Sequence, residues 1–331
     1  MLTQVVRKIF LTRSGNETAC KQHNVASLNI PIRHFDFKFD KDELDSKFYF
    51  QTVLGSAYWQ ALSIFLTYGE DLVIETARFH RDLVIDPVLK QRVTSLIGQE
   101  AIHSKIHEEW NEILKDNRFP VTLYRFLADK VFDHIFLRFP QPMKLSLMAA
   151  IEHFTAVIAQ HMMVNTDSSI MAMMDNPLTR TEDNKTMALW MWHMLEESEH
   201  KDIAYDVYQV LSGNYWLRVS GFVLALVTIL GLVSLGGIML PYLRSPRYLI
   251  SRRYYNDVKD SLKLLVGRKY GVFGSNWHHV FDYLRRDFHP NDHDTTEYLE
   301  FYKKYLLDPE KGLLTPYFIK EFVPPLRTAA A

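Results

Sequence analysis

Long uncharged segments separated by short polar stretches dominate the first two thirds of the chain. The clearest one runs from Phe48 to Tyr68 without a single charge, and it still contains polar side chains such as Gln51, Thr52 and Gln60. An apolar segment with scattered polar residues is typical of a helix buried inside a bundle. We therefore expect a bundle helix here that leads into Glu70.

Helix start and stop signals divide the following segment into three more helices. An Asp before a Pro is a strong helix start, and a Gly just after the apolar pattern suits a helix end. The predicted helices run from Asp86-Pro87 to about Lys115, from Pro140 and Pro142 through Glu152 and His161 to before the chain break at Asp175-Asn176-Pro177, and from Thr181 to Ser212-Gly213. No β pattern of comparable strength occurs, so the sequence predicts an all-α protein.

A further uncharged run of 24 residues, Val219–Tyr242, differs from the bundle helices in being rich in Leu, Val, Ile and Gly. It is long enough to cross a bilayer, and arginines follow it. The alternatives are a fully buried fifth helix, or a shallow re-entrant segment broken at Gly231 or Gly236-Gly237. We favour membrane contact from the cytosolic side, with the topology left open.

These patterns suggest four parts of the chain. Residues 1–45 form an N-terminal arm, in which 31–37 reads as extended, and residues 46–213 form the four-helix bundle. Residues 214–243 form the apolar helix. Residues 244–331, with many Tyr and Arg residues, read as a C-terminal extension of short amphipathic helices and loops.

Composition narrows the class of protein. The 38 basic and 39 acidic residues nearly cancel, which argues against a nucleic-acid partner. Cys20 is the only cysteine, so disulfide frameworks and thiolate metal sites are excluded. The first 30 residues lack the pattern of a secretory signal, which favours the cytoplasmic side.

One pattern of carboxylate and imidazole residues occurs twice in the bundle segment. A lone Glu precedes a Glu-x-x-His pair, and the two copies are Glu70 with Glu100 and His103, and Glu152 with Glu197 and His200. Residues three apart share one face of a helix, and this ligand order is that of dimetal-carboxylate four-helix bundles. The six residues are therefore the predicted metal ligands, against the plainer interpretation that they are solvated helix charges.

Several neighbouring residues are weaker candidates. His107 shares the face of Glu100 and His103, and either an extra ligand or a hydrogen-bonded neighbour fits it. His153 is expected to support a ligand or to pack, and His161 lies more than two turns from Glu152. Glu196 and Glu199 are expected to be solvated or to support the ligands, with Glu196 a rival ligand if the helix phase differs, and Asp71 and Asp202 are candidates for orienting ligand histidines. The Trp- and Met-rich stretches, 171–174 and 190–194, are expected to be core.

The chain resembles a bacterial family of predicted metal-dependent hydrolases with ferritin-like members, over nearly its whole length. The resemblance rests on the arm Pro31–Phe37, on Tyr68-Gly69-Glu70, on the segments 99–107, 152–155 and 196–201, and on Asp282-Tyr283-Leu284 with Phe288-His289-Pro290. It implies a ferritin-like bundle and a metal. The family name says little about the reaction.

Oxygen and imidazole ligands without thiolate suit two metal ions per chain, with Fe favoured and Mn the alternative. From the ligand order we expect a non-haem di-iron oxidoreductase that activates dioxygen on a small, largely apolar or lipid-soluble substrate. The alternatives are a dimetal hydrolase that uses a metal-bound hydroxide and a non-catalytic metal-binding protein. A membrane surface is the expected partner, and a homodimer is compatible with the chain.

Overall fold

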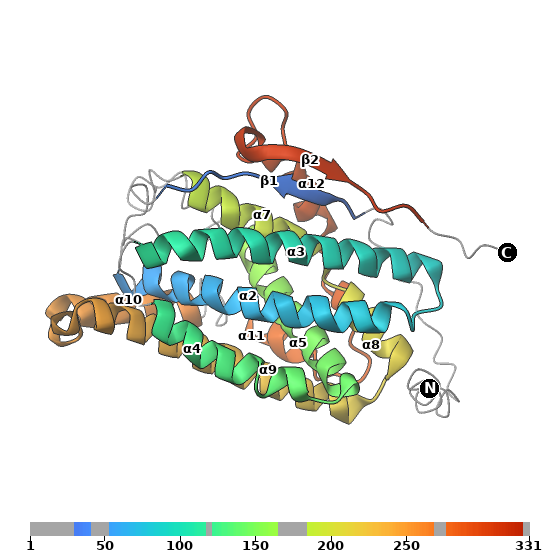
Figure 1. Ribbon diagram of the computed structural model, residues 1–331, viewed down its shortest axis with the longest axis horizontal. Helices are drawn as coiled ribbons and strands as arrows, with labels where there is room; N and C mark the ends of the chain where they lie inside the picture. Colours follow the sequence, from blue (N-terminus) through green and yellow to red (C-terminus); the bar gives the residue numbers. More distant parts are fainter. Residues whose placement is uncertain (1–29, 41–52, 117–120, 165–183, 268–275, 327–331) are drawn as a thin grey trace.

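The computed structural model describes residues 30–40, 53–116, 121–164, 184–267 and 276–326. In this part of the chain helices form almost the whole molecule, with one small two-stranded sheet on top of them (Figure 1). The predicted all-α class is confirmed. The segments around Cys20, Asp175, Thr181 and Met171–Met174 lie outside the described residues.

Four helices form the body that the ligand pattern requires. They are α2 (Val53–Arg81), α3 (Pro87–Asp116), α5 (Gln141–Val164) and α7 (Asn184–His200). Helix α2 packs on α3 and α5, and α7 packs on α5 and α3, so the four enclose a common interior. Asp86 caps α3 as predicted, because its Oδ1 accepts a hydrogen bond of 2.8 Å from the Val88 N–H.

The hydrophobic interior is divided into two clusters. One contains Trp59, Trp110 and Trp190, and the other contains Phe65 and Phe154 together with much of α8. The Trp- and Met-rich stretch at 190–194 is core, as expected. On α2, α3 and α7 the predicted ligands lie between the residues of the two clusters, so a polar layer crosses an otherwise apolar interior.

The predicted fourth helix is wrong in one respect, since it breaks directly after His200. Helix α7 ends there, and a separate helix, α8 (Ile203–Leu211), follows the turn at Lys201 and Asp202. Buried Asp202 binds the equally buried Arg92 of α3 at 2.5 Å, which stabilises the turn. The end at Gly213 is as predicted: its φ is +59°, and its N–H bonds to the Tyr208 carbonyl.

The apolar run forms one continuous helix, α9 (Tyr215–Arg244), so a break at its glycines is wrong. A Cβ on Gly236 would lie 2.6 Å from the Ala61 Cβ, and one on Gly237 would lie 2.9 Å from the Tyr58 ring. The glycines therefore let α9 approach α2 closely. Helix α9 packs along α2 and α5, while its outer side carries exposed apolar residues, so a fully buried helix is wrong too.

The remaining elements surround this body. They are α4 (Val121–Phe132), the 3₁₀ helices η1 (Phe136–Arg138), η2 (Pro246–Ile250), η3 (Pro290–Asp292) and η4 (Thr315–Tyr317), the helices α10 (Arg252–Val266), α11 (Trp277–Asp282) and α12 (Thr296–Leu306), and the strands β1 (Ile32–Phe35) and β2 (Phe318–Phe322). Among the described residues of 244–331, the regular elements are helices except for β2.

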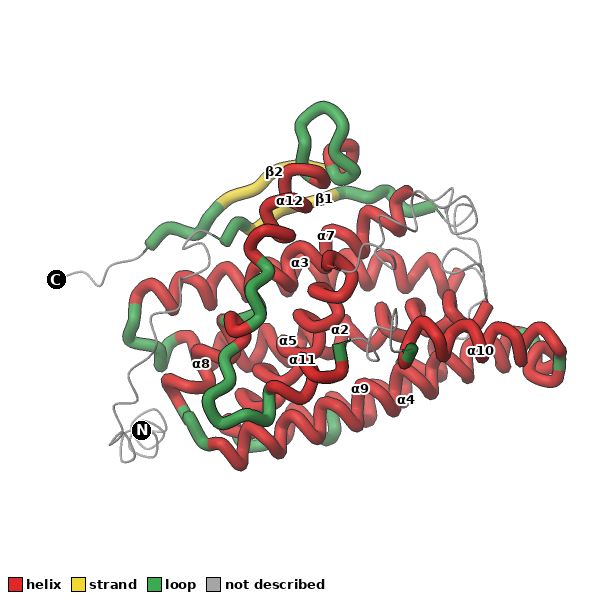
Figure 2. The backbone as a smooth tube through the Cα atoms, turned by 180° about the vertical axis from the view of Figure 1, so that it is seen from behind, coloured by secondary structure: helices red, strands yellow, loops and turns green. Residues whose placement is uncertain are grey.

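The extended arm is a strand because it has a partner far along the chain. Strand β1 pairs antiparallel with β2, with Ile32 opposite Phe322 and Arg33 opposite Glu321. Both views place this sheet over α3 and α7, on the side away from α9 (Figures 1 and 2). The pairing fixes Arg33 above the polar layer.

The tight contact of α9 with α5 generates a stability prediction. A Cβ on Gly221 would lie 2.8 Å from the Ser146 backbone, whereas Gly231 has open space around it. We expect Gly221→Ala to lower the free energy of unfolding by about 1–3 kcal/mol through overpacking. The control Gly231→Ala should raise it by about 0.5–1 kcal/mol, because alanine favours a helix. Denaturant unfolding measures both, and equal effects would contradict the close packing of α9 on α5.

Candidate metal centre

All six predicted ligands meet in the polar layer. Helix α2 contributes Glu70, α3 contributes Glu100 and His103, α5 contributes Glu152, and α7 contributes Glu197 and His200. All six are buried, with at most 3% of each residue exposed. The i, i+3 spacing on α3 and α7 places each Glu and His on one face, which the packing directs inward.

The donor atoms form two adjacent groups that share a residue. Glu70, Glu100 and His103 offer donor atoms within 4.8 Å of one another, and so do Glu100, Glu152 and His200. His200 Nε2 lies 3.2 Å from Glu100 Oε1 and 3.2 Å from Glu152 Oε2. Glu197 contacts both groups, at 3.8 Å from His103 Nδ1 and 3.4 Å from His200 Nε2. Glu100 and Glu197 therefore each lie against both groups, and either carboxylate would be available to both of two metal ions.

Each ligand histidine has its outer nitrogen held by a neighbour. His103 Nε2 lies 3.0 Å from Glu196 Oε2, and His200 Nδ1 lies 2.8 Å from Gln99 Oε1. These contacts leave His103 Nδ1 and His200 Nε2 facing the glutamates. Fixing the outer nitrogen in this way sets the tautomer and ring orientation of metal-binding histidines.

A buried arginine organises the residues behind the histidines. Arg33 of β1 contacts Glu196 at 3.0 Å and binds Glu199 through two hydrogen bonds of 2.8 and 2.9 Å. Glu199 also accepts a hydrogen bond from Gln99 and pairs with Lys303 of α12. Burial alone would lower the pKa of Arg33, but the two glutamates raise it above its usual value. Glu196 and Glu199 thus surround the predicted ligands, and Arg33, which holds both of them, is a residue that the sequence analysis did not single out.

His193 is a second missed residue, and it lies inside the site. Its Nε2 is 3.0 Å from Glu197 Oε1, and its Nδ1 is 2.9 Å from Nε2 of His107. His107 is in turn held by Ser63 at 2.8 Å. Of the two interpretations of His107, the structure favours the supporting one, because both its nitrogens have partners. The sequence signal for His193 was its position four residues before Glu197, on the same helix face.

The other candidates lie away from the donor atoms. Asp71 accepts from Ser104 on the surface, and Asp202 binds Arg92 and Asn291, so the expectation that they orient ligand histidines is wrong. His153 contacts the Val280 carbonyl of α11, as expected of a packing residue. His161 lies 2.9 Å from the amide of Asn276.

Burial makes the site electrostatically costly without cations. Burial and then the charge of Glu100 raise the pKa of Glu70 well above its usual value, and the pKa of Glu152 to about 8. Burial would also raise the pKa of Glu197, but His200 and His193 lower it well below its usual value. Burial lowers the pKa of His193. Protons and histidine charges therefore compensate carboxylates that would otherwise repel one another.

The arrangement of unpaired atoms fits a metal pair. The atoms without a well-directed hydrogen bond include Glu70 Oε1 and Oε2, Glu100 Oε1, Glu152 Oε2, Glu197 Oε2, His103 Nδ1, His193 Nε2 and His200 Nε2. Buried polar atoms normally have partners, so such a concentration in one layer requires an explanation. Two divalent cations would balance four carboxylates and would bind these atoms. Oxygen and imidazole donors without sulfur suit Fe, Mn or Zn.

Buried carboxylates and imidazoles that face one another inside a helical bundle are typical of metal-binding proteins. A model of the family described as predicted metal-dependent hydrolases matches residues 31–294. The chain belongs to this family, as its motifs indicated. No curated protein and no solved structure matches the chain.

The pKa shifts generate a prediction for the metal-free protein. The pKa of Glu152 is about 8 against 4.5 when unfolded. Burial lowers the pKa of His103, but contacts with Glu100 and Glu196 raise it to about 10 against 6.5. Between pH 6.5 and 8 the folded state therefore holds protons that the unfolded state has lost. Stability should fall with rising pH, by about 1.4 kcal/mol per pH unit for each proton concerned.

Metal binding should reverse this dependence. Cations replace the protons, so the stabilisation by metal grows as pH rises. Thermal unfolding of chelated and metal-loaded protein at pH 6.5, 7.2 and 8.0 measures both effects. A metal-free Tm that stays constant or rises over this window would contradict the assigned electrostatics.

Proposed function

We propose that this protein is a hydrolase that uses two metal ions held by Glu70, Glu100, His103, Glu152, Glu197 and His200, with His193 as a seventh donor. The observation that carries the proposal is the layer of buried, mutually facing donor atoms without hydrogen-bond partners. Family membership supports hydrolysis over oxidation. A bound metal pair would supply a Lewis acid and lower the pKa of water to near neutrality.

The chain's own residues hold the site rigid and dry. Gln99 and Glu196 fix the two ligand imidazoles, and Arg33 fixes Glu196. Trp192 packs edge-on against the His103 ring and excludes water from that side. Neither oxygen of Glu70 makes a hydrogen bond among the described residues, so one oxygen would be available to a metal ion and the other to a proton. Apolar clusters on both sides of the layer favour a largely apolar substrate.

Dioxygen activation by a di-iron pair is the second candidate. The observation that favours it is the donor set itself, with four carboxylates and at least two imidazoles in a closed helical interior. The two candidates differ in their need for oxygen. A hydrolase reconstituted with Zn²⁺, Mn²⁺ or Fe²⁺ cleaves chromogenic carboxyl and phosphate esters of apolar alcohols without air. A di-iron oxidase consumes oxygen with a reductant and leaves those esters intact.

Removing one shared ligand tests the assignment. We expect Glu100→Ala to lose most of the approximately two metals per chain and at least 10²-fold in activity. The fold should persist, because removing one of four repelling charges offsets the lost coordination. Elemental analysis, ester hydrolysis and circular dichroism measure the three effects.

The matched control is Glu109→Ala on the same helix, whose side chain is half exposed and pairs only with surface Lys105 among the described contacts. It should keep metal and activity. Full metal content in Glu100→Ala would show that the ligands are assigned incorrectly. Normal metal loading with neither hydrolysis nor oxygen consumption would support a non-catalytic metal-binding protein.

We also propose that the outer face of α9 lies flat on a bilayer. In the described part of the chain, α9 is the one helix long and apolar enough to cross a membrane, a property that buried helices of soluble proteins share. Here its outer side carries a stripe of exposed side chains along its whole length: Trp216, Val223, Val227, Leu230, Leu235, Ile238 and Tyr242. Val227, in the middle of this stripe, is 64% exposed.

The packing of α9 favours a surface orientation over a span. The inner side of α9 contacts α2 and α5, and α2 ends in solvent-exposed charged residues. If α9 crossed the membrane, these packed helices and their charges would have to enter the lipid with it. Exposed basic residues mark both ends of the stripe, with Arg286 over the Tyr215 ring at one end and Arg247, Arg252 and Arg253 near the other. Apolar residues flanked by cations are typical of helices at an anionic lipid interface.

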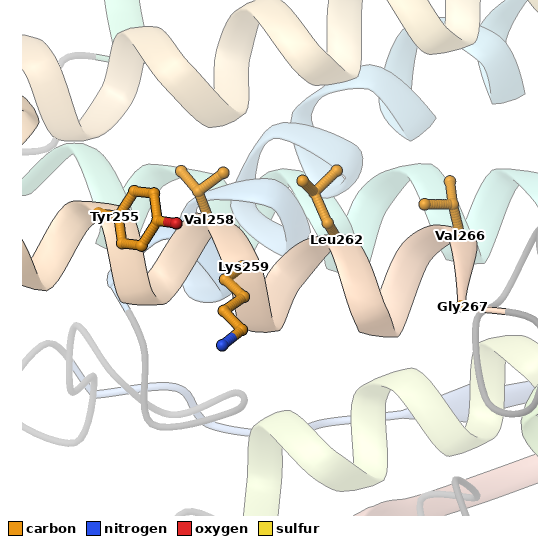
Figure 3. A pocket seen from close by; sticks show the side chains of 6 residues that line it. All are labelled: Tyr255, Val258, Lys259, Leu262, Val266 and Gly267. Atoms are coloured by element: carbon orange, nitrogen blue, oxygen red, sulfur yellow. The ribbon is translucent and has the colours of Figure 1, made fainter.

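Helix α10 extends this face at the end of α9. Tyr255, Val258, Leu262 and Val266 follow one another along it and line an open, mainly apolar groove of about 430 Å³ beside Lys259 (Figure 3). Helix α4, which packs beside α9, adds exposed Leu123 and Phe126. A lipid-soluble substrate would meet the protein on this side.

Sedimentation with vesicles tests the membrane proposal. We expect the protein to bind vesicles containing anionic phosphatidylserine, and Val227→Glu with Leu230→Glu to reduce binding at least tenfold, because charges would enter the lipid. The control Glu300→Gln changes an exposed residue of α12, near the opposite sheet. Unchanged vesicle binding in the double variant would contradict the proposal. The proposal would also be contradicted if the wild-type protein were a dimer that does not bind vesicles and if the double variant were a monomer.

A further inference from the structure

A second group of metal-type side chains lies outside the bundle, in the C-terminal extension. It consists of His279 and Asp282 on α11 and His293 just after η3, and we call it the α11 triad. His293 Nε2 lies 2.9 Å from His279 Nδ1 and 2.9 Å from Asp282 Oδ2, while His279 Nδ1 lies 3.9 Å from Asp282 Oδ2. The side chains are 10–27% exposed, so the triad is reachable from solvent.

The hydrogen bonds among these three atoms compete with one another. An imidazole nitrogen carries either one proton or one lone pair, directed along one line in the ring plane. His293 Nε2 therefore cannot make good hydrogen bonds to both His279 and Asp282. A cation between the three atoms would interact with all of them at once.

The dimensions of the triad match a tetrahedral ion. Zinc binds nitrogen and oxygen at about 2.0–2.2 Å, which places tetrahedral ligand atoms roughly 3.3 Å apart. The three observed separations, two of 2.9 Å and one of 3.9 Å, lie on either side of that value. Two imidazoles exclude Ca²⁺ and Mg²⁺ as preferred ions, because those ions take oxygen ligands.

We propose that the α11 triad binds one further divalent transition-metal ion, Zn²⁺ above all, with water in its fourth position. Both imidazoles are available as ligands near neutral pH, since burial and then the neighbouring imidazoles lower the pKa of His279, and burial lowers that of His293. The proposal does not depend on the reaction catalysed in the bundle.

The contacts of the triad suggest what this ion does. Val280, between its two α11 ligands, accepts a hydrogen bond from His153, the neighbour of Glu152. The carbonyl of His293 accepts one of 2.5 Å from Lys201, the neighbour of His200. An ion in the triad joins α11 to the segment after η3, and so clamps both onto residues adjacent to bundle ligands.

Zinc titration of the full-length protein tests this site. Protein already loaded at the bundle should take up one additional Zn²⁺ by calorimetry, with a rise in Tm. His279→Gln and Asp282→Asn, both at partly exposed positions, should lose that equivalent while bundle metal content stays at the wild-type value. The matched control is His278→Gln, which changes the exposed neighbour of His279 outside the triad.

Cobalt gives an independent readout. Co²⁺ added to loaded protein should produce the visible absorption of a tetrahedral site in wild type and His278→Gln, and none in His279→Gln. Equal zinc uptake and equal cobalt spectra in all variants would overturn the proposal. The absence of an additional equivalent in wild type would overturn it as well, whether or not the bundle proves catalytic.

Discussion

The arrangement of the rest of this molecule depends on four carboxylates that are buried at one level of a helical bundle. Such a layer is strongly unfavourable unless opposite charge compensates it. In the protein itself the compensation comes from imidazoles and retained protons, and His103 and His200 each lie against two or more glutamates. The neighbouring apolar clusters are therefore interrupted at that level, and the surrounding chain is arranged to hold the charged side chains in fixed positions.

That arrangement extends far beyond the ligand helices. Arg33 comes from the N-terminal strand, Lys303 from α12 near the C-terminal end, and both reach Glu199 on α7. Glu199, beside the predicted ligands on α7, is thus held by residues more than a hundred positions away. Substituting this buried arginine or either of its two carboxylate partners would destabilise the fold, because the loss of any one leaves an uncompensated charge in the interior.

Local geometry explains which parts of this structure were predictable from sequence. Glu-x-x-His pairs and the Asp86-Pro87 start depend on residues within one or two helical turns, so their spacing identifies them. Arg33 depends on a partner 163 residues away, and nothing near it indicates burial. His193 stood in a Trp- and Met-rich stretch that read as core, and the helix break after His200 depends on the tertiary pairing of Asp202 with Arg92. The doubled ligand order and the all-α class were readable, whereas the long-range supports were not.

The pairing of β1 with β2 has a consequence for biosynthesis. All ligand residues have left the ribosome well before residues 318–322 are made, yet β2 is the strand that holds β1, and β1 carries Arg33. During synthesis the helices of the polar layer therefore pass through a period in which their glutamates and histidines are present but Arg33 is not yet held above them. Under the proposed function, metal ions would enter during that period and would be enclosed when the last strand joins the sheet.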